Sequence, residues 1–492
     1  MNLILVRVFK GVKNTLFGFD AKLLTMKEIV LVLEDQVDFI PSQQLANLCG
    51  YSSTSQILKL CKELDGYIKE CYPSQEFELI INKHYGIKLV TPPFSNNDQL
   101  LDYIVMEDLA YLIYQAVLLE RVVPTEEFCQ DNFISNSTLQ RRIKKINYYI
   151  NNYGLHITFS QQYFKLSGDE LIIRSFSFVL LFIIHRQLSK IPWIENKQNY
   201  LGLSQQIADY LSLPFLTIQH EVFGLLLFTF ENARKKEFTF LYQAKDFPYM
   251  EKIHFPKKPT FLSQWTDDDW QFLLLQSYST NLVNFEFPLD LSDVQSNIVN
   301  QVTQDWQQAF EESFLPLNDN QKSFLYDSIE KKFFSDYFFI ADDALTAISF
   351  PVNLEQFKEQ NPIYMHPFNQ FWKTFSKAQP DWMDGYFKIQ SLLLCRYFLP
   401  IRMVLPKVKV YVDSDLTSLS LNRMKDHLVL YFANKYQISI VTTNKEADLI
   451  VTTTKPQKDK ILPGQEVVMT RIQLAKRDLL HIDQAIQKIV FK

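Results

Sequence analysis

The sequence predicts a multidomain, mainly helical protein with two N-terminal winged helix-turn-helix domains, two all-helical bundles and a small C-terminal α/β domain. Three observations predict this class. The 492 residues are too many for one hydrophobic core, so roughly three to five domains are expected. Glycine is scarce, with only 11 residues, and long stretches repeat their apolar side chains at the period of a helix. Strand and helix patterns alternate only in the last part of the chain, which predicts a parallel sheet there.

The composition is that of a folded and acidic protein. Hydrophobic residues make up 47% and charged residues 21%, and the net charge is −5. An acidic protein does not bind nucleic acid indiscriminately, so any such contact must be confined to one region. The five cysteines form no CxxC pair, and we expect reduced thiols in the cytoplasm rather than a zinc site or disulfides. The most apolar stretch, 171–184, contains Arg174 and is too short to span a bilayer, so no membrane association is expected.

Residues 1–24 read as a basic leader, and residues 25–92 are predicted to form the first winged helix-turn-helix domain. Three helices followed by a hairpin are expected at Thr25–Leu33, Ser42–Leu48, Ser53–Ile68, Phe77–Asn82 and Gly86–Val90. The third helix turns an apolar stripe inward and leaves Gln56, Lys59 and Lys62 outward, as candidates for DNA contact. For this domain and for the second one described next, the alternative is an ordinary helical hairpin with a solvated basic face.

Residues 99–168 are predicted to form the second such domain. A long apolar helix, Gln99–Leu119, leads into a short helix, Thr125–Gln130. The next helix carries one apolar stripe at four- and three-residue steps, formed by Leu139, Ile143, Ile146 and Ile150. Two short alternating runs, 155–159 and 163–166, complete the order helix, turn, helix and hairpin of a winged helix.

The side of this helix opposite the apolar stripe is basic. Between Asn132 and Gly168 there is no acidic residue, while five Lys or Arg residues fall in that span. The chain as a whole has a net negative charge, so binding to a phosphate backbone is the best explanation for a positively charged segment here. The expected DNA contacts are Ser137, Thr138, Gln140, Arg141, Arg142, Lys144 and Lys145. Lys and Arg would bind phosphates, while Gln, Thr and Arg would read base edges.

From residue 170 to residue 400 the sequence is helical and aromatic, and we divide it into bundles at 170–287 and 288–400. The expected helices are Leu171–Leu188, Gln205–Leu211, Ile218–Lys235, Asp267–Asn281, Val294–Phe314, Gln321–Phe339 and Trp382–Tyr397. Residues 405–492 alternate strands with helices, which predicts a small α/β domain.

The sequence lacks the common catalytic motifs. It has no nucleotide-binding glycine loop, zinc-protease motif or esterase motif, and no two histidines lie at metal-ligand spacing. We therefore expect no enzyme activity, no metal and no cofactor. Four of the eight histidines fall in the helical bundles, at His185, His220, His254 and His366. Each alone is more often structural, although histidine accepts phosphoryl groups and changes charge near neutral pH.

The order of domains, with the stretches NFISNSTLQRRIKKINYYINNYGL and KVKVYVDSDLTSLSLNRMKDHLVLYFANKY, resembles the Mga/AtxA-type virulence regulators of Gram-positive bacteria over almost the full length. The resemblance implies that the bundles are phosphotransferase-regulation domains (PRDs), whose histidines are phosphorylated by the sugar phosphotransferase system. The matching positions are His185 and His254 in the first bundle and His366 in the second, with His220 a weaker match.

The same resemblance implies an enzyme IIB-like tail that often serves for dimerisation. An enzyme IIB carries an acceptor Cys or His after its first strand, but the loop 412–417 here reads VDSDLT. Neither residue is present, and the two aspartates would repel a phosphoryl group. We therefore assign the tail to assembly of a homodimer rather than to phosphotransfer.

The predicted function is that of a DNA-binding transcriptional regulator, an activator of virulence or carbohydrate-linked genes, which binds double-stranded promoter DNA and responds to a phosphotransferase-system phosphoryl donor. Two alternatives stay open: a PRD-containing RNA-binding antiterminator, and an enzymatic phosphotransfer component. The first would need a small RNA-binding β module at the N-terminus, where helix-turn-helix patterns are found instead.

Overall fold

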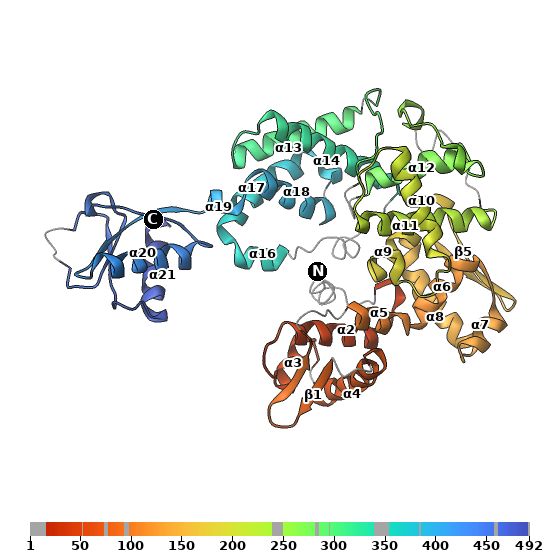
Figure 1. Cartoon of the computed structure of the whole chain (residues 1–492), viewed down its shortest axis with the longest axis horizontal. Helices are drawn as coiled ribbons and strands as arrows, with labels where there is room; N and C mark the ends of the chain where they lie inside the picture. Colours follow the sequence, from red (N-terminus) through yellow and green to blue (C-terminus); the bar gives the residue numbers. More distant parts are fainter. Residues whose placement is uncertain are drawn as a thin grey trace. The chain divides into compact units, whose positions relative to one another are not determined.

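The computed structural model describes residues 16–490, except residues 52, 73–76, 93–97, 239–248, 281–284, 295, 339–353, 383–384 and 457–460. Most of the predicted leader, up to residue 15, therefore lies outside the described residues. The chain divides into two compact units: one comprises residues 1–305, 322–353 and 381–389, and the other comprises residues 306–321, 354–380 and 390–492. The mainly helical class is confirmed (Figure 1).

The first winged unit lies in the first compact unit. Its elements are α2 (Ala21–Glu34), α3 (Ser42–Leu48), α4 (Thr54–Cys71), β1 (Glu78–Asn82), β2 (Gly86–Val90) and α5 (Asp98–Met106). The hairpin is antiparallel, and Ile40 bridges Ile87 at its side, which completes a winged helix. The expected start of α2 at Thr25 is wrong, because the Asp20 carboxylate caps the helix by accepting a hydrogen bond from Lys22 N.

The second winged unit lies in the same compact unit. Its elements are α6 (Leu109–Glu120), β3 (Val122–Pro124), α7 (Thr125–Asp131), α8 (Asn136–Ile150), β4 (His156–Phe159) and β5 (Tyr163–Ser167). The sheet is antiparallel in the order β3-β5-β4. The expected single helix 99–119 is instead two helices, because Asp108 caps α6 through Ala110 N at 2.7 Å. Helix α5 packs its Leu100 and Ile104 into the core of the first winged unit.

In the described residues up to 404, ten α-helices follow, several of them lined by aromatic side chains. They are α9 (Glu170–His185), α10 (Lys197–Tyr210), α11 (Thr217–Lys235), α12 (Asp267–Ser279), α13 (Asn297–Ser313), α14 (Asp319–Phe338), α16 (Leu354–Gln360), α17 (Pro362–Ala378), α18 (Gly385–Phe398) and α19 (Ile401–Val404). Helices α16 and α17 were missed by the sequence prediction, and α17 contains Pro367, which weakens a helical pattern. The division into bundles at residue 288 stays a prediction.

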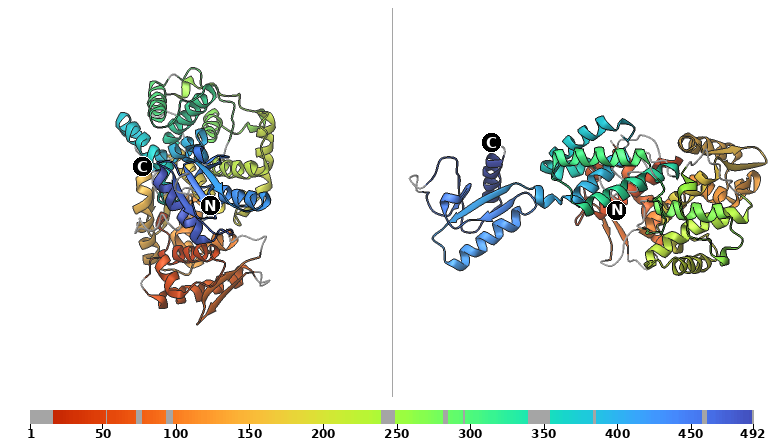
Figure 2. Two further views of the ribbon diagram at one scale, coloured as in Figure 1. Left: turned by 90° about the vertical axis from the view of Figure 1, so that its left-hand side faces the viewer. Right: turned by 90° about the horizontal axis from the view of Figure 1, so that it is seen from above.

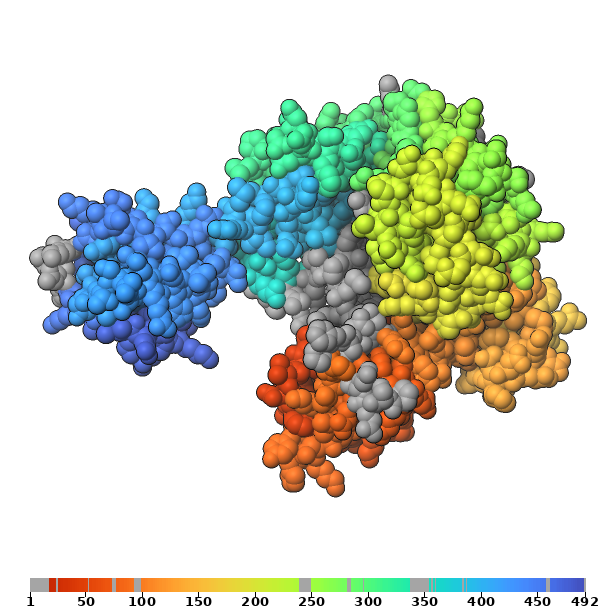
Figure 3. Space-filling model, viewed as in Figure 1, coloured from red at the N-terminus to blue at the C-terminus, as the bar shows by residue number. Residues whose placement is uncertain are grey.

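The C-terminal α/β layer lies in the second compact unit. It consists of β6 (Lys407–Asp413), α20 (Ser418–Phe432), β7 (Gln437–Ile440), β8 (Leu449–Thr452), β9 (Glu466–Met469) and α21 (Lys476–Val490). The sheet is parallel, as expected, in the order β7-β6-β8-β9, with Val410 beside Leu449 and Val451 beside Val468. Helices α20 and α21 share one core with the strands (Figure 2). Figure 3 shows the outer surface of this layer in blue.

Within the described residues, none of the helices combines the length and the apolar character that a bilayer crossing requires.

Candidate nucleic-acid interface

Helix α8 is oriented by its apolar stripe. Leu139, Ile143, Ile146 and Ile150 are each at most 2% exposed, as the periodicity predicted. Ser135 caps the helix by accepting a hydrogen bond from Thr138 N at 3.2 Å, and its hydroxyl also lies 2.9 Å from the Thr138 hydroxyl. On the side away from this buried stripe, four side chains are exposed: Ser137, Gln140, Arg141 and Lys144. We call these four residues the outer face of α8.

The outer face of α8 is positively charged and uncompensated. Within the described part of the chain, no ion pair is found for Arg141 or Lys144. Helix α8 and the hairpin that follows it carry no acidic residue between Asn132 and Gly168. Exposed cations on one face of a helix form a surface that attracts phosphate oxygens.

Arg142 and Lys145 are engaged elsewhere, although both were predicted to contact DNA. Arg142 Nη1 donates to Gly18 O at 3.0 Å, and Nη2 lies 3.3 Å from the Asp20 carboxylate. Lys145 Nζ donates to Phe19 O at 3.0 Å. Burial lowers the pKa of Lys145, and the charge of the neighbouring Arg142 lowers it further. Thr138 is only half-buried, but its hydroxyl is taken up by the helix cap.

Asn147 fixes the wing to helix α8. This buried amide donates to Ile157 O at 2.8 Å and accepts from Ile157 N at 2.7 Å. Strand β4 is therefore joined to helix α8 by two buried hydrogen bonds, which hold its orientation well in a low-dielectric environment. At the tip of the wing, Ser160 closes the turn by bonding both backbone groups of Tyr163, and Gln161 and Gln162 are exposed.

Phe133 is an exposed aromatic residue that the sequence prediction did not single out. It lies in the turn between α7 and α8, is 96% exposed, and has a left-handed backbone with φ 53°. Its N–H bonds Gln130 O and the next N–H bonds Cys129 O, so Phe133 occupies the position after a helix where glycine is preferred. The sequence could have indicated this residue, because a turn that favours glycine contains none.

The first winged unit presents a weaker charge. Gln56, Lys59 and Lys62 are exposed on α4, as predicted. The same helix carries three acidic residues, Glu63, Asp65 and Glu70, against three lysines, so α4 has no net charge. Glu63 pairs with Lys22 at 2.5 Å and Asp65 with Lys69 at 2.6 Å. At the tip of its wing, Lys83, His84 and Tyr85 are exposed, which the sequence prediction did not include.

Two of the predicted phosphorylation residues are withdrawn from solvent. His185 is fully buried, and its Nε2 lies 2.7 Å from the Tyr111 hydroxyl, which also accepts from Trp193 Nε1. Burial lowers the pKa of His185 to about 4, so the ring is neutral at physiological pH. His220 is half-buried and bonds the Ser204 hydroxyl at 2.9 Å, and burial also lowers its pKa.

The other two histidines are exposed. His254 Nε2 lies 2.6 Å from the Asp293 carboxylate, and a short antiparallel bridge to Asp290 holds its backbone. The hydrogen bond to Asp293 raises the pKa of His254 above its ordinary value. His366, on α17, is exposed, and its Nε2 lies 3.3 Å from the Gln370 amide nitrogen.

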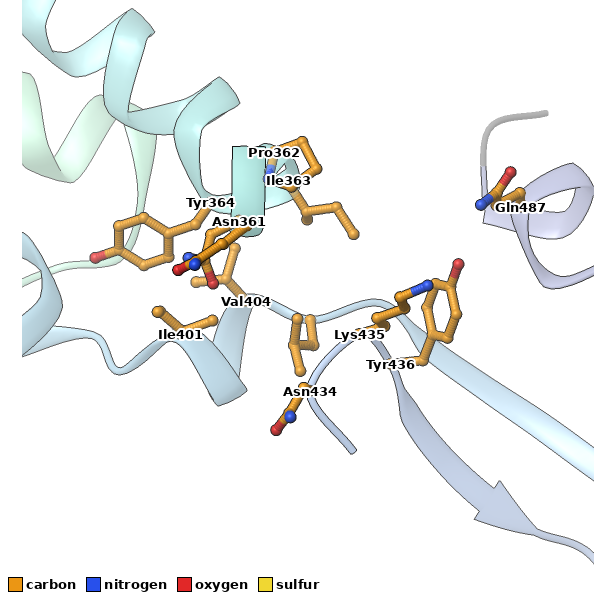
Figure 4. A pocket seen from close by; sticks show the side chains of 12 residues that line it. Asn361, Pro362, Ile363, Tyr364, Ile401, Val404, Asn434, Lys435, Tyr436 and Gln487 are labelled. Atoms are coloured by element: carbon orange, nitrogen blue, oxygen red, sulfur yellow. The ribbon is translucent and has the colours of Figure 1, made fainter. Parts of the chain in front are cut away.

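A cavity of about 270 Å³ lies between the start of α17, helix α19 and the loop before β7 (Figure 4). Asn361, Tyr364, Val404 and Lys435 are among its lining residues. Tyr364 donates to Leu399 O, and Lys435 pairs with Asp483 at 2.9 Å. These polar groups therefore serve internal contacts. In the described part of the chain, no cluster of three His, Cys, Asp or Glu residues is arranged to hold a metal ion.

The loop after β6 is bonded to the residue that follows strand β8. The Ser414 hydroxyl lies 2.7 Å from the Thr453 hydroxyl, which also reaches Asp415 at 3.4 Å. The short side chains in this loop thus bind the end of the neighbouring strand β8.

Comparison with known families places a helix-turn-helix domain at this site. Residues 94–182 match the family model of the Mga helix-turn-helix domain, a span that includes α6, α7, α8 and the wing. Among curated proteins, none matches the chain. The geometry of α8 and the family match agree on a DNA-binding domain of the Mga type.

Proposed function

We propose that the protein is a transcriptional regulator that binds promoter DNA through the outer face of α8. The observation that carries this proposal is the exposure of Arg141 and Lys144, without ion pairs in the described residues, directly opposite a fully buried stripe. Placed in a major groove, the N-terminal turns of such a helix reach base edges while its cations meet phosphates. Ser137 and Gln140 are the side chains available for base contact.

A binding experiment with a matched control tests this proposal. Duplexes enriched from genomic DNA by the wild-type protein are titrated with an Arg141→Ala/Lys144→Ala variant. The control, Lys407→Ala/Lys409→Ala, removes the same charge from the exposed side of β6. Loss of affinity only in the first variant supports the proposal. Equal affinity of wild type and the first variant at moderate salt would refute the site.

The proposal also includes regulation: phosphorylation of histidines controls the activation of virulence or carbohydrate-linked genes. His254 and His366 are the favoured acceptors because both are exposed, whereas a donor reaches His185 only after local opening. The Asp293 carboxylate holds Nε2 of His254, which leaves Nδ1 as the nucleophile. A phosphoryl group adds negative charge and shifts the population of packing states.

Mass spectrometry after incubation with a phosphotransferase-system donor tests this part. We expect phosphate on wild type and its loss in a His254→Ala/His366→Ala variant. Phosphate retained in that variant, and lost on His185→Ala or His220→Ala instead, would reassign the acceptor.

Dimerisation through the α/β layer is also proposed. Leu419 and Leu430 on α20 are 85% and 74% exposed, which favours a partner surface on that helix. Light scattering of the full chain is expected to report a dimer for wild type and a monomer for Leu419→Glu/Leu430→Glu.

Of the alternatives, an RNA-binding antiterminator is disfavoured because winged-helix elements occupy the described N-terminal residues. A shift assay with matched duplex DNA and RNA separates the two. A phosphotransfer component is disfavoured because the loop after β6 has no Cys or His acceptor and its Ser414 hydroxyl bonds Thr453, and a transfer assay to a second protein decides it.

A further inference from the structure

The first winged unit begins and ends at the same place in the molecule. The chain enters it at Asp20, the cap of α2, and leaves it at Asp108, the cap of α6. The backbone N–H of Asp20 donates to the Asp108 carboxylate, so the two ends are directly bonded. Both connections consist of described residues, 19–21 and 106–109.

The described residues just before Asp20 pack against the second winged unit and α9. We call residues 16–20 the strap. Phe17 and Phe19 are 2% and 5% exposed, and their rings pack against Phe176 and Tyr114 at 5.8 Å and 6.4 Å between centroids. Gly18, with φ +80°, lies so close to Ile146 of α8 that an added Cβ would be 2.9 Å from its side chain. The strap is therefore a fixed part of the second unit's core.

Arg142 joins the strap to both ends of the first unit. Its guanidinium bonds Gly18 O at 3.0 Å and lies 3.3 Å from Asp20 and 3.7 Å from Asp108. Two carboxylates that cap two different helices thus share one cation, which is only 17% exposed. Three oxygen partners and this burial leave Arg142 little capacity to bind a phosphate.

We infer that the first winged unit is inserted into the second and that Arg142 locks the junction, so that both units bind one duplex at a single fixed spacing. The inference rests on the proposed DNA binding. A unit tethered by one linker pivots freely, whereas two adjacent connections and a shared ion cluster remove that freedom. Arg142 is thus a positioning residue, and DNA recognition is composite: α8 reads one half-site while the first unit reads a second at a set distance.

Two variants and one matched control separate this role from direct DNA contact. Asp20→Asn keeps a good helix cap but removes the charge that faces Arg142. Arg142→Gln removes the shared cation. Arg141→Gln, the control, changes an exposed neighbour on the same helix. Thermal unfolding is recorded for all three, to establish that each one is folded.

Hydrogen exchange tests the junction without DNA. In wild type, the backbone amides of residues 17–23 and 106–110 are expected to exchange slowly. Asp20→Asn and Arg142→Gln should raise exchange in both segments at least tenfold, while Arg141→Gln leaves it unchanged. Unchanged exchange in both junction variants overturns the lock.

Spacing variants of an enriched duplex test the composite reading. Inserting 5 or 10 base pairs between the two protected half-sites should weaken wild-type binding at least tenfold, because a fixed pair cannot follow either shift. Arg142→Gln should reduce this penalty below threefold, and Arg141→Gln should weaken binding to all duplexes with the penalty unchanged. Wild-type tolerance of both insertions, or a footprint with one half-site, overturns composite reading. Failure of wild type to bind any duplex overturns the proposed function itself. The hydrogen-exchange measurement then still tests whether Arg142 holds the junction.

Discussion

The salt dependence of DNA binding gives the most quantitative test of which cations on α8 meet phosphates. Of the four basic residues on this helix, Arg141 and Lys144 are exposed, whereas Arg142 and Lys145 bond the strap. Each phosphate contact contributes about 0.9 to the slope of log affinity against log salt. The double substitution Arg141→Ala/Lys144→Ala should therefore lower the slope by about 1.8.

The same release of counterions sets the loss of affinity. At 0.1 M salt, relative to a 1 M reference, a slope change of about 1.8 corresponds to roughly 60-fold weaker binding. This is about 2.5 kcal/mol of binding free energy. The assay is fluorescence anisotropy on one enriched duplex from 50 to 300 mM salt. A slope that falls equally for Arg142→Gln/Lys145→Gln would refute the reasoning, because those side chains would then reach phosphates despite their bonds to the strap.

Three further predictions concern stability, each measured by chemical denaturation. Gly18→Ala should lower the free energy of unfolding by at least about 1 kcal/mol, since φ is +80° and the new Cβ meets Ile146; an unchanged value would mean that the strap is not docked. Asn147→Leu should cost about 2–4 kcal/mol by leaving both backbone groups of Ile157 without this partner, and a cost below 1 kcal/mol contradicts it. Burial lowers the pKa of His185 to about 4, so the unfolded chain binds the proton first as pH falls through 6.5. Wild type should therefore lose about 3 kcal/mol more than His185→Gln between pH 6.5 and pH 4, and parallel pH profiles would contradict the burial.

Helix α8 could be predicted from the local sequence pattern alone. The steps of Leu139, Ile143, Ile146 and Ile150 define the buried side of a helix without reference to any other part of the chain. The order of short helix, turn, helix and hairpin was predictable for the same reason. The exposed residues of the outer face of α8 followed from the stripe.

Non-local contacts account for what the sequence did not predict. Arg142 meets Gly18 across 124 residues, and no periodicity connects two such positions. On a helical wheel Lys145 lies as far from the apolar stripe as Lys144 does, while Arg142 flanks the stripe. The contacts of Arg142 and Lys145 with the strap cannot be read from that pattern. The sequence did not predict the break before α6, because Glu107 and Asp108 could equally be surface residues of one continuous helix. The structure shows instead that the Asp108 carboxylate caps α6.

Burial of single histidines was equally inaccessible to sequence reasoning. His185 ends an apolar helix in the sequence, and its complete burial depends on Tyr111, which lies 74 residues away. His254 gains its carboxylate partner from Asp293, 39 residues on. Such pairings decide which imidazoles a phosphoryl donor can reach, and they join segments that are far apart in the sequence.

Site-specific photo-crosslinking from position 140 tests the central claim most directly. A photoreactive residue in place of exposed Gln140 should crosslink to bases of an enriched duplex, whereas the same residue in place of exposed Asn422 on α20 should not. Crosslinking from position 140 places the outer face of α8 in the groove. No crosslink from position 140, under conditions where the duplex is fully bound, would contradict the account.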